Sequence, residues 1–386
     1  MTKDTLLTPN FVKLTLSNLL MAIAFYFITP VMSLFMVDVF NSESNEVGVV
    51  MFAFSVAAII SRPFTGFLLD SFDRYRVYIS SFVFFLIAFL GYPMVSLFAF
   101  LLVLRFYHGL AWGAVSTASN TIAVDLISEK RRGEGIGVFG LSMVIAMAIG
   151  PAVAIMLSNR LGYNALFYTA TAFCVMGFLL VLFIKMPAKN NVKKKFELKA
   201  LINKQTIYVA QNVLLTQIPY GGIVTFAALY GREIGVANSG VFFILLSIGI
   251  LSSRVVSGRI FDRVGPRNVV ISGILLVVVG LLIIGAYATV LGFHISAMVL
   301  GIGFGIVSPT FQAMANAKVS PEKRGAVNST YLTFFDSGVG IGMLLFGVLF
   351  DLVGYSNTFY ISAIVQILAL VLFISVTYPK YRKQIS

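Results

Sequence analysis

Long apolar stretches, separated by short polar segments, set the pattern of this chain. Each stretch is about 20 residues long, which is the length that a helix needs to cross the hydrocarbon of a bilayer. The stretches are continuous rather than alternating, so they predict helices and not strands. The expected membrane spans are residues 11–36, 47–69, 77–97, 99–122, 135–157, 165–185, 206–229, 239–258, 269–288, 291–315, 326–349 and 357–378.

The composition also indicates a membrane protein. Of the 386 residues, 59% are hydrophobic and only 11% are charged, and the mean hydropathy is +0.94. A soluble domain of this length cannot bury so much apolar surface. The single cysteine, Cys174, lies inside an apolar stretch, which excludes an intrachain disulfide and a zinc cluster.

The net charge of +13 would fit a nucleic-acid-binding protein, but the positions of the charges favour another explanation. With the N-terminus in the cytoplasm, every Lys and Arg except Arg105, Arg160 and Arg232 falls on the cytoplasmic side or at its edge. Cytoplasmic loops of membrane proteins carry such an excess. We therefore expect a multi-pass protein of the plasma (inner) membrane with both termini cytoplasmic, which contacts the lipid bilayer and not nucleic acid.

One charged segment between two spans occurs twice. Residues 61–76 read SRPFTGFLLDSFDRYR and residues 253–268 read SRVVSGRIFDRVGPRN, an offset of 192 residues. Further positions match at the same offset, among them Gly109 and Gly301. Two such halves are parallel repeats. The expected domains are an N-terminal six-helix bundle at 1–186, a cytoplasmic linker at 187–205 and a C-terminal six-helix bundle at 206–386.

The repeated segment also carries a family motif, G-x-L-x-D-x-x-G-R-K. The first copy contributes Gly66, Asp70, Arg74 and Arg76. The second copy contributes Gly258, Asp262, Arg263 and Arg267. In the first copy, Asp73 stands where the family has Gly. With these motifs the chain resembles a transporter of the major facilitator superfamily, in the twelve-helix, drug/proton antiporter-like branch.

The resemblance implies an all-α membrane protein with twelve transmembrane helices in two pseudo-symmetric six-helix bundles. It also implies an inner gate, in which Asp70 faces the N-terminus of the helix that begins near Ala326 and holds the cytoplasmic side shut. The motif glycines would let a neighbouring backbone approach. Arg74 and Arg76 have possible partners in Asp125 and Glu129. The alternative is that these residues are only orienting surface charges.

Charged residues inside a span are costly and therefore point to mechanism. Arg105 lies in LLVLRFYHGLAWGA, which is similar to the family's R-x-x-Q-G pattern with His108 in place of Gln. Proton-coupled members use that arginine in coupling or to tune a nearby acid. The alternative for Arg105 is a side chain that snorkels to the outer interface.

Asp336 is the carboxylate expected deepest in the membrane, ten residues past Ala326 and so about 15 Å in. We expect it to carry a coupling proton, or alternatively to form a structural ion pair. Arg62 is eight residues before Asp70, so it lies at about 12 Å of depth on a helix that faces Asp336 in this fold. We therefore expect Arg62 to pair with Asp336 in one conformation.

Helix breakers mark expected kinks, which are Pro30, Gly150, Pro151 and Pro219. Gly150 and Pro151 belong to a partial match to the G-x8-G-x3-G-P-x2-G-G antiporter motif. Without the family, they indicate only a kink with close packing. Pro30 and Pro219 are candidates for bending at the outer gate, or are ordinary irregularities.

The helices that line the cavity in this fold supply the candidate substrate contacts. They are Asn18, Tyr26, Tyr107, His108, Trp112, Gln211, Asn212, Gln217, Tyr220 and Gln312. The two histidines are each alone, so no metal site is expected.

These observations predict a secondary active transporter, acting in proton-coupled efflux (antiport) of small amphipathic molecules by alternating access. The alternatives are proton-coupled uptake of a sugar, organic acid or metallophore-like solute, and a non-transporting membrane sensor. The sequence has no nucleophile–base pair and no phosphate-binding loop, so an enzyme is not expected. We expect a monomer without a cofactor, driven by the proton gradient.

Overall fold

Helices form every regular element in the part of the chain that the computed structural model describes, which is residues 6–128, 131–184, 203, 206–317, 319 and 324–385. Side chains of 132–133, 255–264, 324–326 and 385 are outside that description. Contacts between Cα atoms divide the chain into two units. Unit 1 is Met1–Val31 with Ala53–Phe196, and unit 2 is Met32–Phe52 with Glu197–Ser386.

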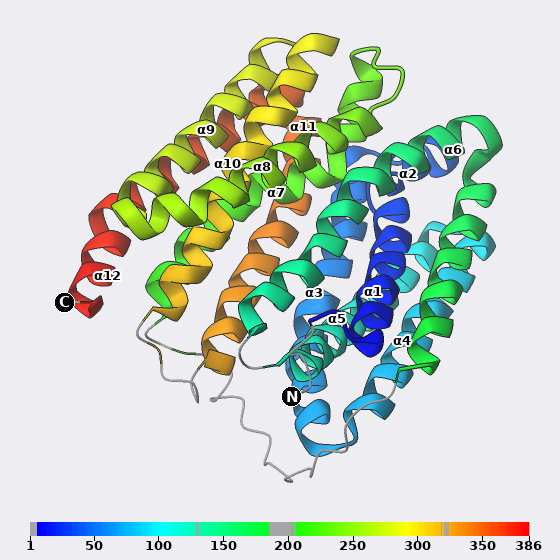
Figure 1. Ribbon diagram of the computed structural model, residues 1–386. Helices are drawn as coiled ribbons and strands as arrows, with labels where there is room; N and C mark the ends of the chain where they lie inside the picture. The colour runs from blue at the N-terminus through cyan, green and yellow to red at the C-terminus, as the bar shows by residue number, and fades with distance from the viewer. Residues whose placement is uncertain are drawn as a thin grey trace. The chain divides into compact units, whose positions relative to one another are not determined.

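Unit 1 is built from four complete helices and most of a fifth (Figure 1). They are α1 (Pro9–Ile28), the larger part of α3 (Ser44–Ser71), α4 (Arg74–Gly91), α5 (Phe98–Leu126) and α6 (Arg132–Leu182), with the short 3₁₀ helix η1 (Tyr92–Met94) after α4. Local chemistry sets the helix starts. The Asp73 side chain accepts a hydrogen bond from the backbone N–H of Arg76 at 2.9 Å, so the residue that departs from the family motif caps α4.

Unit 2 contains the remaining helices and the first residues of α3 (Figure 1). They are α2 (Met32–Phe40), α7 (Ile207–Glu233), α8 (Gly240–Val264), α9 (Pro266–Ala286), α10 (Val290–Asn316), α11 (Arg324–Leu372), the π-helical η6 (Phe373–Thr377) and α12 (Tyr378–Ile385). Within the unit, α7 packs on α11, and α10 packs on α8 and α9.

The two longest helices are each two helices joined at a glycine. Gly162 in α6 has φ 80° and ψ 174°, and Gly354 in α11 has φ 80° and ψ 171°. Among the described residues, 9 helices are long and apolar enough to span a membrane. Dividing α6 and α11 at these glycines accounts for eleven of the expected spans, and α8 covers the position of the other.

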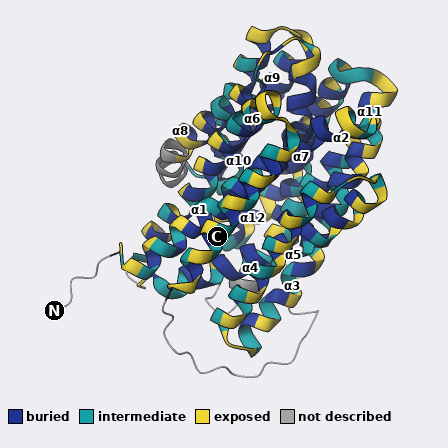
Figure 2. Ribbon diagram, turned by 90° about the vertical axis from the view of Figure 1, so that its right-hand side faces the viewer, coloured by how far each residue is buried: buried dark blue, intermediate teal, exposed yellow. Residues whose placement is uncertain are grey.

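Each of these helices has both buried and exposed positions (Figure 2). Many of the exposed positions carry large apolar side chains, as the buried ones do. On α9, Ile274 and Leu281 are buried, whereas Leu275, Val279 and Leu282 are exposed. A helix on the surface of a soluble protein would carry polar residues at the exposed positions. The exposed apolar face therefore identifies α9 as a helix that contacts lipid.

The internal repeat predicted from sequence is visible in the packing of each unit. A Cβ atom added to Gly109 of α5 would lie 2.2 Å from the carbonyl oxygen of Phe54, and one added to Gly301 of α10 would lie 2.1 Å from that of Leu246. Phe54 and Leu246 are themselves 192 positions apart. Both units therefore use one helix crossing in which the backbones meet directly.

The predicted domains at 1–186 and 206–386 stay a prediction, and most of the linker at 187–205 lies outside the described residues. Residues 32–52 group with unit 2 although the sequence places them among the N-terminal helices.

Candidate functional site

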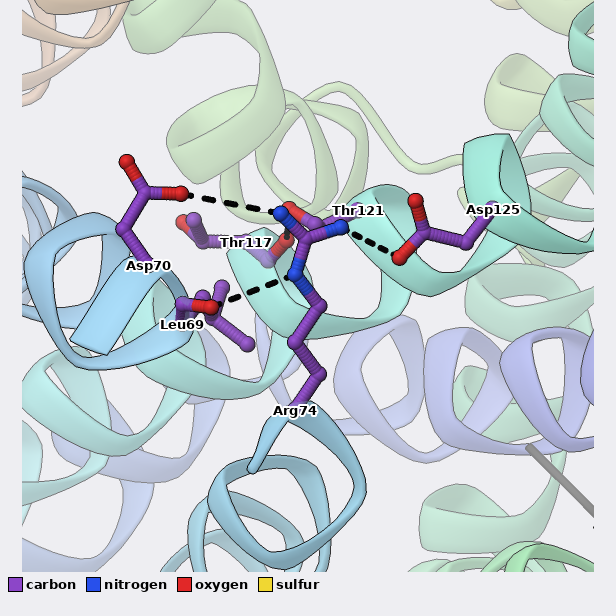
Figure 3. A network of polar contacts seen from close by, with 6 residues as sticks. All are labelled: Leu69, Asp70, Arg74, Thr117, Thr121 and Asp125. Carbon is purple, nitrogen blue, oxygen red and sulfur yellow. Dashed lines mark hydrogen bonds and ion pairs between the residues drawn. The ribbon is translucent and has the colours of Figure 1, made fainter. Parts of the chain in front are cut away.

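Arg74 is the centre of a polar network at one end of unit 1 (Figure 3). Its Nε donates to the carbonyl oxygen of Leu69 at 3.2 Å, and its guanidinium lies 3.6 Å from Asp70 Oδ1. The same guanidinium donates to Asp125 Oδ2 on α5. Arg74 therefore ties together the end of α3, the start of α4 and the end of α5.

The pairing of Arg74 with Asp125 is the one expected from sequence. Its side chains are only 17% and 18% exposed, so water screens the ion pair less than at an open surface. Thr117 and Thr121 of α5 lie beside the guanidinium (Figure 3). Glu129, the other candidate partner, is outside the described residues.

A Cβ atom added to Gly66 would meet nothing within 4 Å among the described residues. The close approach of a neighbouring backbone that its motif predicts stays a prediction. In the second copy of the motif, the side chains of Asp262 and Arg263 and the position of Gly258 lie outside the described side chains. Arg267 is described, and its guanidinium carbon lies 5.7 Å from the centre of the Tyr378 ring.

A second network surrounds Arg105 in the interior of unit 1. The Arg105 side chain is 0% exposed, so it does not snorkel to an interface. Its Nη1 donates to the hydroxyl oxygen of Tyr92 at 3.2 Å, and that oxygen lies 2.6 Å from Nδ1 of His108. The guanidinium carbon also lies 4.5 Å from the centre of the Phe54 ring, a cation–π distance.

Tyr92 links Arg105 to His108 through one hydroxyl group. Its oxygen accepts from Arg105. The direction of the hydrogen bond between this hydroxyl and Nδ1 of His108 depends on the histidine tautomer, because a hydroxyl can both donate and accept. His108 Nε2 is buried without a hydrogen-bond partner among the described residues.

Aromatic rings enclose this network. The ring of His108 has Phe54, Phe85 and Phe89 within 5.1 to 5.3 Å between centroids. Trp112, one helical turn further along α5, stacks on Phe25 of α1 at 4.1 Å. The structure thus brings the predicted residues Arg105, His108 and Trp112 onto one face of α5, and it adds Tyr92, which the sequence did not single out.

Tyr92 escaped prediction because it lies in η1, beyond the regular part of α4 and thirteen positions from Arg105. The only signal was the sequence Tyr92-Pro93 at the end of an apolar stretch, which indicates a helix end rather than a site.

Several candidate cavity residues instead form hydrogen bonds inside one unit. Asn18 donates to Ser142 Oγ at 2.6 Å and accepts from Ser119 Oγ at 3.1 Å. Asn212 donates to the carbonyl oxygen of Ala369 at 2.7 Å. Both side chains are buried, so they hold helices together.

The other candidates differ in exposure. Gln217 is buried and donates to Ser308 Oγ at 3.1 Å, and the neighbouring Tyr220 meets the Phe304 ring edge-on at 5.2 Å. Tyr107 donates to the carbonyl oxygen of Phe84 on α4 at 3.1 Å. Tyr26 is half-buried on α1. Gln211 and Gln312 are exposed.

Asp336 and Arg62 are both half-buried, on α11 and α3. Asp336 belongs to unit 2 and Arg62 to unit 1, and their pairing stays a prediction.

The expected kinks have different outcomes. The helix is interrupted at 29–31, around Pro30, where α1 ends and α2 has not begun. Pro151 and Pro219 lie inside α6 and α7 without an interruption at either position. Gly150 lies against α1, since a Cβ atom there would be 2.8 Å from Cβ of Tyr26.

Known proteins with similar sequences belong to one family of transporters. Residues 14–267 and 213–386 match the sequence model of the Major Facilitator Superfamily. The chain is 23% identical over 357 residues to an uncharacterized MFS-type transporter, MJ1560, of Methanocaldococcus jannaschii, covering 88% of this chain and 91% of that protein. It is 22% identical over 353 residues to the staphylopine export protein of Staphylococcus aureus, covering 86% and 87%.

Among solved structures, the nucleoside transporter NupG has a TM-score of 0.79 at 15% identity, over 95% of this chain and 99% of that chain. At this identity the likeness shows the fold alone. The family match covers nearly the whole chain, and its members are transporters and not enzymes. This chain is therefore a transporter that belongs to the Major Facilitator Superfamily.

Proposed function

We propose that this transporter exports small amphipathic molecules in exchange for protons, by alternating access. The observation that carries the proposal is the fully buried Arg105, hydrogen-bonded to Tyr92 inside an apolar helix bundle. A charge kept inside the membrane is costly and marks an ion or substrate pathway. The similarity to a staphylopine export protein supports the direction of transport.

In this proposal Asp336 carries the coupling proton. It is the deep carboxylate of α11, and its half-buried position would let it exchange protons with water in one state of the cycle. Arg62 would form an ion pair with the ionised carboxylate of Asp336, and this pair would break when Asp336 is protonated. Arg105 would tune the site electrostatically from within unit 1.

The proposed substrate surface is mainly aromatic. Trp112 stacked on Phe25, together with half-buried Tyr26, offers flat apolar faces on the helices of unit 1. Gln217 and Tyr220 offer an amide and a hydroxyl on α7 of unit 2. Apolar faces with a few polar groups suit amphipathic molecules better than sugars.

The proposed location is the plasma (inner) membrane, with the protein as a monomer and both termini in the cytoplasm. The proton gradient is the energy source, and no cofactor takes part.

The test is transport in proteoliposomes of known orientation. A panel of amphipathic compounds is measured with and without an imposed proton gradient, for the wild type, Asp336→Asn and the control Glu134→Gln. Glu134 is a good control because it pairs with Arg131 at an exposed position.

We expect the proton gradient to drive substrate against the proton flow in the wild type and in Glu134→Gln. Asp336→Asn should lose this coupling and keep substrate exchange without a gradient. Movement of substrate with the protons would establish uptake instead, and full proton-driven export by Asp336→Asn would rule out Asp336 as the proton carrier.

A further inference from the structure

Residues 32–52 consist of α2, the short connection after it and the first turns of α3, and they pack within unit 2. Val47, Val50 and Met51 are 0% exposed there. A Cβ atom added to Gly347 of α11 would lie 2.3 Å from the carbonyl oxygen of Ser44 and 3.1 Å from Cα of Gly48. The first turns of α3 therefore cross α11 with the two backbones in contact.

A carboxylate of α11 holds the first turn of α3. Asp351 lies one turn after Gly347, and its Oδ1 accepts from the backbone N–H of Ser44 at 3.2 Å. Its Oδ2 accepts from the backbone N–H of Asn45 at 2.8 Å. The first N–H groups of a helix have no partner in the helix itself, and they carry its positive dipole end. Asp351 supplies both the acceptor and the negative charge.

An ion pair holds the other side of the segment. Arg232, in the last turn of α7, lies 2.5 Å from Asp38 Oδ1 on α2. Arg232, Ser44 and Asp351 line one cavity of about 320 Å³, so the two attachments share a single polar pocket. Two polar contacts thus hold residues 32–52 against the rest of unit 2. Arg232 of α7 binds Asp38 before α3 begins, and Asp351 of α11 binds the first turn of α3.

We propose that Asp351 and Arg232 form an outer latch, which holds residues 32–52 on unit 2 and releases them once in each transport cycle. The inference rests on the proposed alternating access and orientation, in which these residues face the outside. The N-terminal half offers no equivalent, because the position 192 residues before Asp351 is Asn159 and the one before Arg232 is Phe40. The latch is therefore single, although the fold is duplicated.

The two polar contacts of the latch are weak enough to open and close. Arg232 and Asp38 are 45% and 39% exposed, and Asp351 is exposed. Exposed ion pairs and charges at helix ends stabilise only weakly. The latch thus biases the position of residues 32–52 without fixing it.

The experiment follows the accessibility of a buried residue of the segment. In a Cys174→Ser background, Val47→Cys places a single thiol at a position that is 0% exposed. A membrane-impermeant maleimide is added to intact cells, and the labelling rate is compared among latch variants. The readout needs no substrate, so it stands apart from the transport assay.

We expect Asp351→Asn to raise the labelling rate by about three- to tenfold, because a weak contact shifts the equilibrium by that order. Glu43→Gln is the matched control, since Glu43 lines the same cavity and its carboxylate accepts from the side chain of nearby Asn45 at 3.4 Å, a contact within the segment itself. Its labelling rate should equal that of the wild type.

A charge exchange tests the ion pair and guards against misfolded variants. Asp38→Arg and Arg232→Asp should each raise the rate, and the double variant should return it towards the wild-type value. The latch is overturned if Asp351→Asn labels at the wild-type rate, if Glu43→Gln matches Asp351→Asn, or if the double variant fails to restore protection. Labelling of Val47→Cys only from the cytoplasmic side would instead overturn the proposed membrane orientation, in which these residues face the outside.

Discussion

The hydroxyl oxygen of Tyr92 lies 2.6 Å from Nδ1 of His108 and accepts a hydrogen bond from Arg105. One hydroxyl thus contacts a buried guanidinium on one side and a buried imidazole on the other. In an interior of low dielectric, both hydrogen bonds are stronger than they would be in water. Tyr92 therefore helps to position Arg105, the buried charge to which we assign a part in transport.

Tyr92→Phe should destabilise unit 1 by about 1–3 kcal/mol, because it removes one hydrogen bond from each of two buried polar groups, Arg105 and His108. Thermal unfolding is measured in detergent with a thiol-reactive dye, which reports exposure of the single buried cysteine, Cys174. The control is Tyr107→Phe, since the Tyr107 hydroxyl bonds to a backbone carbonyl at an exposed position. Equal unfolding temperatures for the two variants would contradict a special role for Tyr92.

Arg74→Gln should lower both stability and transport, because two carboxylates, Asp70 and Asp125, lose their shared cation. We expect a loss of about 1–3 kcal/mol, as for partly buried charges that lose a hydrogen-bonded partner. Thermal unfolding and vesicle transport are measured on the same samples. Arg131→Gln, at an exposed pair with Glu134, should cost no more than about 1 kcal/mol. A larger effect at Arg131 would refute this ranking.

Gly109→Ala and Gly301→Ala should each destabilise the protein by about 1–3 kcal/mol, since the added Cβ atom meets a backbone oxygen that must move. The measured quantity is again the unfolding temperature. Gly140→Ala on α6 is the control, because its Cβ atom would meet nothing within 4 Å in the part of the chain that the structure describes, and alanine favours a helix. The prediction fails if Gly140→Ala is as harmful as the other two.

Asp351→Asn combined with Gly48→Ala tests whether the two features of the α3–α11 crossing depend on each other. A Cβ atom on Gly48 would lie 2.9 Å from the carbonyl oxygen of Met343, so Gly48→Ala should push α3 away from α11 and weaken the Asp351 contact. The second substitution should then add little to the labelling rate of Val47→Cys. Purely additive effects on the logarithm of that rate would show that the contacts act independently.

The sequence predicted the class of fold and its duplication well, because both depend on local patterns. Apolar length alone places the helices, although α5 runs to Leu126, four residues beyond the expected end. The repeat was found from the charged segment that occurs at 61–76 and 253–268, with further matches at the same offset. The crossings at Gly109 and Gly301 give the physical reason for one of those matches. Sequence spacing alone predicted a contact wherever that contact requires one residue type, such as glycine at a helix crossing.

The candidate site was predicted only in part, because its contacts join distant positions. The pair of Arg74 with Asp125 was one of those foreseen from opposite charges near neighbouring inner loops. The Tyr92–His108 contact instead depends on how η1 packs against α5. The contact of Asp351 with Ser44 spans 307 positions and has no local signal beyond an acid at the end of an apolar stretch. Pro219 lies inside an uninterrupted helix, and its predicted kink stays a prediction.

The helix α3 belongs to both units at once. Its 28 residues run unbroken from Ser44, which Asp351 binds, to Ser71, beside Asp70 and Arg74. At helical rise the helix is about 42 Å long. One continuous helix therefore carries both polar contacts, the one that Asp351 makes at its first turn and the one that Arg74 makes at its end. A coupling free energy between two such contacts acts equally in both directions, so the effect of a substitution at either contact has to be measured at both.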